Sequence, residues 1–126
     1  MVGSPYQTTK TLAKDLKFIE DFSPEMCGIG PFIPHKATDF RDFPSGDVDL
    51  TCYLLSIIRL INPTILLPAT TALGTAEQGG REKGILCGAI VIMPNLSPGV
   101  NARCIRSRHF CCPEKFLRYF QKAFPF

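Results

Sequence analysis

The sequence lacks the features that would place it at once in a membrane, secretory or metal-binding class. No run approaches the roughly 18 uncharged apolar residues that a membrane-spanning helix needs. No basic stretch followed by an apolar one marks a secretory signal at its amino end. None of the six cysteines has a partner at CxxC spacing, which argues against zinc-ribbon and thioredoxin-like proteins. We therefore expect a cytoplasmic protein that binds neither membrane nor nucleic acid, and in which disulfides are not expected.

The composition that is present is globular, but it changes along the chain. Apolar residues make up 45% of the 126 residues and charged residues 20%, enough for one domain with its own core. Residues 1–98 hold 8 Lys or Arg and 10 Asp or Glu, a net charge of −2, whereas residues 99–126 hold 6 and 1, a net charge of +5. We predict a folded part over 1–98 and an atypical basic tail over 99–126, which carries a short amphipathic helix.

Two amphipathic helices are predicted in the first half of the chain. The first follows an N-cap at Thr8 and ends at Ser23-Pro24, with its apolar residues at helical spacing: Leu12, Leu16 and Ile19. The second begins at Asp47 or Asp49 and ends at Asn62-Pro63. Its predicted buried stripe is Leu50, Leu54, Ile57 and Ile61.

Apolar segments without alternation separate these helices. Residues 26–32, 64–69 and 89–93 are predicted as strands buried on both faces, and residues 1–3 as a further short strand. Residues 34–46 and 70–80 are predicted as loops, and 81–87 as a short helix with Gly88 as its C-cap. Strands that alternate with helices indicate an α/β fold with a parallel sheet. We expect half of a (β/α)8 barrel, about four βα units; a small doubly wound sheet is the alternative.

Functional groups in either architecture gather where parallel strands end. Thr70 and Thr71 follow such a strand, and their hydroxyls and the backbone N–H groups after them could hold a carboxylate or phosphate. The alternative is a turn in which the hydroxyls bond the local backbone. Gly79-Gly80 before a helix could cradle an anion or form a flexible turn. His35 also follows a strand, but no ligand-type residue lies at a useful spacing from it.

Four motifs are more specific than their composition. They read MCGIGPFIPH (26–35), PATTALGT (68–75), GGREKG (79–84) and CGAIVIMPNLS (87–97). In this order and spacing they resemble the radical S-adenosylmethionine (SAM) enzymes of hydrogenase maturation, whose pattern is MVGIGPFIPH, PATTALGT, GGREKG and AGANVVMPNLTP. The resemblance covers residues 1 to about 98. It implies the carboxyl-terminal half of a (β/α)8 barrel whose missing amino-terminal half is the natural partner.

The resemblance also implies a function. The whole enzyme would use a 4Fe-4S cluster to cleave SAM to a 5′-deoxyadenosyl radical, which attacks a small sulfur-containing substrate during assembly of the hydrogenase di-iron cofactor. Its cavity contacts correspond here to Met26, Thr70, Thr71 and Met93. The threonines would hold an anionic or carboxylate group, and the methionines would form an apolar wall.

Two departures from the family limit this expectation. The CxxxCxxC motif that ligates the cluster is absent, so we assign no catalytic or metal residue and expect this chain alone to bind no cofactor and to be inactive. After Pro98 the sequence leaves the family pattern, as translation in a shifted frame would produce. A biotin synthase-like or methylornithine synthase-like fragment is an alternative, although biotin synthases carry a cluster-binding arginine in the strand equivalent to 64–71, which has none here. Two further alternatives remain. One is a non-catalytic half barrel that binds an anion or pairs with another half barrel, and the other is a complete small α/β domain.

Overall fold

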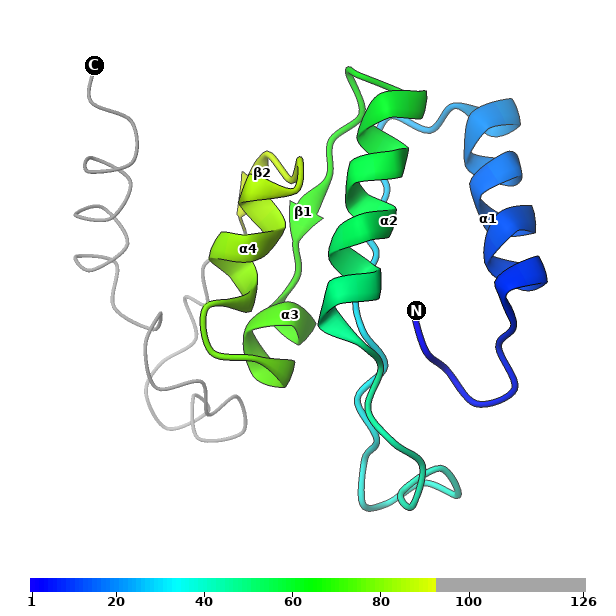
Figure 1. Ribbon diagram of the computed structural model, residues 1–126, viewed down its shortest axis with the longest axis vertical. Helices are drawn as coiled ribbons and strands as arrows, with labels where there is room; N and C mark the ends of the chain where they lie inside the picture. The colour runs from blue at the N-terminus through cyan, green and yellow to red at the C-terminus, as the bar shows by residue number, and fades with distance from the viewer. Residues whose placement is uncertain (93–126) are drawn as a thin grey trace. The chain divides into compact units, whose positions relative to one another are not determined.

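The computed structural model of the chain describes residues 1–92. The elements of this part are α1 (Thr9–Phe22), α2 (Val48–Ile61), β1 (Pro68–Ala69), α3 (Thr71–Ala76), α4 (Gly80–Leu86) and β2 (Val91–Ile92). Helices α1, α2 and α4 stand side by side with their amino ends toward the same end of the molecule (Figure 1). The predictions for residues 93–126 lie outside the described part; they include the end of the last strand and the basic tail.

Helix α1 begins where its sequence predicts. The Thr8 hydroxyl accepts a hydrogen bond from the Thr11 amide at 3.3 Å, and the Thr8 amide donates to the Thr11 hydroxyl at 3.0 Å. This reciprocal capping satisfies two amides that the first helical turn leaves free. Ser23 closes the helix in a left-handed conformation, with its amide bonded to the Ile19 carbonyl at 2.9 Å. No residue of α1 is fully buried, so its apolar stripe is only partly covered.

Helix α2 has the predicted ends but a different buried face. Asp47 is the N-cap, and its carboxylate accepts from the Asp49 amide at 2.8 Å. Of the predicted stripe, only Leu54 is fully buried, and Leu50, Ile57 and Ile61 are half-buried. The buried residues are Val48, Thr51, Cys52, Leu54, Leu55 and Ile58. Since α2 is apolar around most of its circumference, periodicity alone could not select the face that packs.

The extended segments pair in parallel and in chain order. Val2 bridges to Pro31, Met26 bridges to Leu66, and β1 pairs with β2 through Pro68–Val91 and Ala69–Ile92. Segments 26–32 and 64–69 were predicted as continuous strands, but the structure reduces them to isolated bridges and the two-residue β1. Segment 26–32 contains two glycines, which weaken a strand, and Pro31; segment 64–69 contains Pro68, and a proline cannot donate to a ladder.

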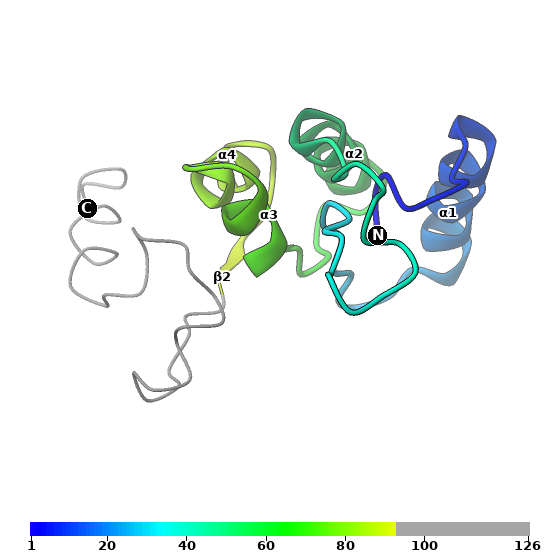
Figure 2. The same ribbon diagram turned by 90° about the horizontal axis from the view of Figure 1, so that it is seen from below.

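The core lies between α2 and the extended segments. Leu55 and Leu67 are fully buried there. The whole cluster is Val48, Cys52, Leu55, Ile58, Ile65, Leu67 and Leu73, with Leu16, Ile19, Cys27, Ile29 and Cys87 packed against it. Seen from the end, the helices lie on one side of the extended segments (Figure 2). Within residues 1–92, no helix has both the length and the apolar character to cross a bilayer.

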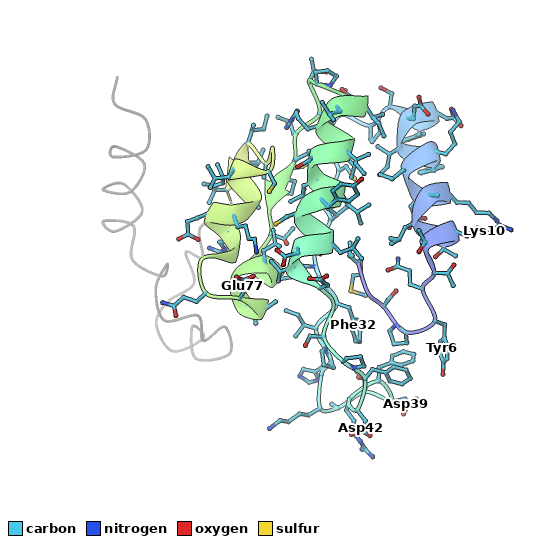
Figure 3. The ribbon with its side chains drawn as sticks, in the orientation of Figure 1. Tyr6, Lys10, Phe32, Asp39, Asp42 and Glu77 are labelled. Carbon is cyan, nitrogen blue, oxygen red and sulfur yellow. The ribbon has the colours of Figure 1, made fainter. Side chains whose placement is uncertain are left out.

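Two loops emerge at the end where the segments finish. Residues 34–46 form a loop, as predicted, beside Tyr6 and Phe32 (Figure 3). The Tyr6 ring meets the Phe43 ring edge-on at 5.9 Å, which joins this loop to the amino-terminal one.

Residues 70–80 were also predicted as a loop, but they contain α3. Its apolar anchor, Leu73, is fully buried in the core, and this packing stabilises a helix too short to stand alone.

Candidate functional site

Three pairs of residues build one face of the extended segments. Met26 is the bridge partner of Leu66. Two residues further along both segments, the position of a Gly28 Cβ would lie 3.7 Å from Pro68 Cγ. After two more residues, a Gly30 Cβ would lie 2.6 Å from Thr70 Oγ1. Because alternate residues of an extended chain share a face, these three pairs form a ladder that ends at Thr70.

Glycine at position 30 is what lets Thr70 occupy its place. Any side chain there would meet Thr70 Oγ1 at 2.6 Å and the Ala72 Cβ at 3.2 Å. Glycine inside an extended segment often marks a close backbone approach, and this segment has two glycines. The structure confirms it at Gly30, whereas Gly28 has only an ordinary contact. Gly30 is therefore part of the site, although sequence reasoning did not include it among the site residues.

The Thr70 hydroxyl is the chemically notable group at this end of the ladder. Thr70 is the N-cap of α3, yet its side chain makes no capping hydrogen bond. Its Oγ1 is buried and has no hydrogen-bond partner in the described part of the chain. The alternative in which this hydroxyl bonds the local backbone is therefore wrong for Thr70. Since buried hydroxyls are nearly always paired with protein or ordered water, this oxygen has a donor and an acceptor free for a water molecule or a bound group.

The other predicted site residues lie at different distances from Thr70. Thr71 is adjacent and exposed as the first residue of α3. Met26 is 43% exposed and pairs with Leu66, four residues before Thr70, so it lies about 13 Å back along the strand direction. The structure thus brings Thr70 and Thr71 together without Met26. Met93 lies outside the described residues.

The glycine-rich motif before α4 serves packing. Gly79 is the left-handed N-cap of α4, at φ 80°, and a Cβ on Gly80 would collide with the Leu73 carbonyl. The positive φ explains Gly79 and the close approach of α3 to α4 explains Gly80, so neither glycine requires an anion. Arg81 is buried against Gly74, and its Nε has no hydrogen-bond partner within residues 1–92.

His35 is exposed in a turn, where its Nδ1 accepts from the Ala37 amide at 3.2 Å.

The described thiols do not fit an iron–sulfur cluster. No group of three or more His, Cys, Asp or Glu side chains comes together anywhere in residues 1–92. Burial raises the pKa of the Cys27 thiol. Burial, followed by the neighbouring Cys87, raises the pKa of Cys52 to about 11. Since a cluster needs thiolates, neither residue is prepared to ligate one.

The described part is thus an α/β assembly of parallel segments with a hydroxyl site where they end. No protein-family model matches the chain. Over 98 residues, however, the chain is 47% identical to the "[FeFe] hydrogenase maturase subunit HydE" of Thermotoga maritima. That match takes in 78% of this chain and 28% of the length of HydE. It confirms the resemblance found in the motifs: over the matched residues, the chain is similar to a hydrogenase maturase, of which it spans little more than a quarter.

Proposed function

We propose that this chain is part of a radical SAM enzyme of hydrogenase maturation, and that its described residues hold the anionic end of a small sulfur-containing substrate. The similarity to HydE supports the reaction class. The observation that carries the binding role is the buried hydroxyl of Thr70 at the end of the ladder, which has no hydrogen-bond partner among residues 1–92. A carboxylate there would accept a hydrogen bond from this hydroxyl and others from exposed Thr71.

The described residues would bind and orient, and would not perform the radical step. Their thiols do not fit an iron–sulfur cluster, so these residues have no part in a reaction step at the cluster. What they supply is a hydroxyl held in one place, since the Gly30 backbone approaches Thr70 closely from the neighbouring segment. A group fixed in this way orients its ligand with little loss of side-chain freedom on binding.

A ligand comparison tests this role on the full 126-residue chain. L-Cysteine carries a thiol and a carboxylate, and cysteamine is the same molecule without the carboxylate. We expect millimolar L-cysteine to shift the backbone amide NMR signals of residues 70–73, and cysteamine to leave them unchanged. Thr70→Ala should abolish the shifts. Thr75→Ala is the matched control, because its hydroxyl bonds the Thr71 carbonyl at 3.0 Å on the same helix. Equal shifts with both ligands, or shifts that survive Thr70→Ala, would contradict the proposal.

A second candidate is a half barrel that pairs with a separate half. The parallel, chain-ordered segments support the half-barrel fold. The pairing is favoured by Met26 and Leu66, the first pair of the ladder, which are 43% and 44% exposed. Parallel sheets are normally covered on both faces. We expect a chain that carries the CxxxCxxC half of a hydrogenase maturase to form a 1:1 complex with this one in sedimentation velocity. Leu66→Lys should weaken the complex at least tenfold, and Leu60→Lys, at an exposed position, should not. Failure of the unmodified chain to form the complex would contradict pairing.

A further inference from the structure

Two thiols from distant parts of the chain meet on one face of α2. Cys52 lies within α2 and is 4% exposed. Cys87, the C-cap of α4, is half-buried and packs against the core cluster to which Cys52 belongs. Both cysteines are reduced in the structure, and the Cys87 thiol lies near enough to contribute to the raised pKa of Cys52.

A hydrogen bond fixes this meeting in register. Ser56 lies one helical turn after Cys52, and its hydroxyl donates to the Cys87 carbonyl at 3.0 Å and lies 3.2 Å from the Cys52 carbonyl. Residues four apart on a helix share a face. The backbone of Cys87 is therefore held over the same face of α2 that carries the Cys52 side chain.

The two thiols differ in how easily an oxidant can reach them. Cys87 is half-buried and is the more accessible of the two residues, whereas Cys52 is only 4% exposed. The raised pKa of Cys52 keeps it protonated at neutral pH, so it is a poor first nucleophile. This difference suits a pair in which Cys87 reacts first and Cys52 reacts second.

We propose that Cys52 and Cys87 form a reversible disulfide when the chain meets a small disulfide oxidant such as oxidised glutathione. The Cys87 thiolate attacks one sulfur of the oxidant, and the first glutathione leaves as a thiolate. Cys52 then loses its proton to solvent and attacks the Cys87 sulfur, and the second glutathione leaves. Two protein thiols are oxidised, one glutathione disulfide is reduced to two glutathiones, and the two protons end on the released thiolates.

The bond would tie the candidate site to α2. The chain between Cys52 and Cys87 contains β1, α3 and the Thr70–Thr71 pair. A disulfide across this span would strongly restrict the unfolded chain, because the loop that it closes is long. Oxidation would thus act as a reversible clamp on the segment that carries the site.

Peptide mapping tests the bond on the full chain. The chain is equilibrated with glutathione disulfide at pH 8, its remaining thiols are blocked with N-ethylmaleimide, and it is digested with trypsin without reduction. Cys52 falls in peptide 42–59 and Cys87 in peptide 84–103, apart from every other cysteine. We expect the 42–59/84–103 crosslink to exceed any other at least tenfold, and the oxidised chain to unfold at least about 5 °C higher than the reduced one.

Three variants separate the roles of the cysteines. Cys52→Ser should leave a stable glutathione adduct on Cys87, and Cys87→Ala, which places the family's alanine there, should leave Cys52 reduced. Cys27→Ser is the matched control and should keep the crosslink. Circular dichroism checks that each variant folds. The proposal is overturned if wild-type Cys52 stays reduced beside a glutathionylated Cys87. It is also overturned if the crosslinks of the folded chain are distributed over all cysteines as widely as those of the chain unfolded in urea.

Discussion

A single methyl group on Gly30 should disturb the candidate site, and the structure gives the size of the effect. The new Cβ of Gly30→Ala would lie 2.6 Å from Thr70 Oγ1 and 3.2 Å from the Ala72 Cβ. Thr70 is β-branched and Ala72 is held in α3, so neither can move away easily. Overpacking of this kind lowers the free energy of unfolding by about 1–3 kcal/mol. Gly28→Ala is the matched control, since its Cβ would meet only Pro68 Cγ, at 3.7 Å.

The effect can be traced to Thr70 by a double-mutant cycle. Thr70→Ala removes the oxygen nearest to the new methyl group, so Gly30→Ala should cost less in that background. We expect a coupling free energy of about 0.5–3 kcal/mol in the direction of relief. Urea unfolding of the four proteins, followed by circular dichroism at 222 nm, measures it. Equal destabilisation by Gly28→Ala and Gly30→Ala, or a cycle without coupling, would show that the two segments do not meet at Thr70.

Three further predictions concern the core, a cap and pH. Leu55→Ala should lower the free energy of unfolding by about 2–5 kcal/mol because the side chain is fully buried, whereas Leu60→Ala on the same helix, at a position 81% exposed, should change it little; urea titration compares them. Thr8→Ala should cost about 0.5–2 kcal/mol by removing the α1 cap, and Thr9→Ala should cost less. The pKa of Cys52 is raised from 9.0 to about 11, so the stability present below pH 9 should fall as the pH rises toward 11. Cys52→Ala should flatten that fall in urea midpoints measured across the range.

The ends of the long helices could be read from the sequence because local chemistry determines them. Thr8 and Asp47 cap α1 and α2 with their own side chains, and Asn62-Pro63 ends α2. These signals need only neighbouring residues. The buried face of α2 depends on what packs against it, and a helix that is apolar on most sides leaves that choice to the tertiary structure.

The candidate site shows the same division. Thr70 and Thr71 were predicted because polar groups gather where parallel strands end. The role of Gly30 was missed, because its significance depends on its register with a segment forty residues later, where Thr70 stands opposite. The clearest signal in the sequence was the pair of glycines in segment 26–32, which indicated close approach without naming the group that approaches.

The exposed pair Met26–Leu66 and the buried Thr70 hydroxyl belong to one ladder, and this links folding to binding. Met26 and Leu66 leave apolar surface uncovered at one end, and at the other the buried Thr70 hydroxyl has no partner within the described part of the chain. Each is unfavourable for the chain by itself. A second half barrel against this face would cover the first, and a ligand enclosed between the halves would pair with the second. We therefore expect association and ligand binding to strengthen each other, since a ligand enclosed at Thr70 and a second half barrel would contact the same face of the extended segments.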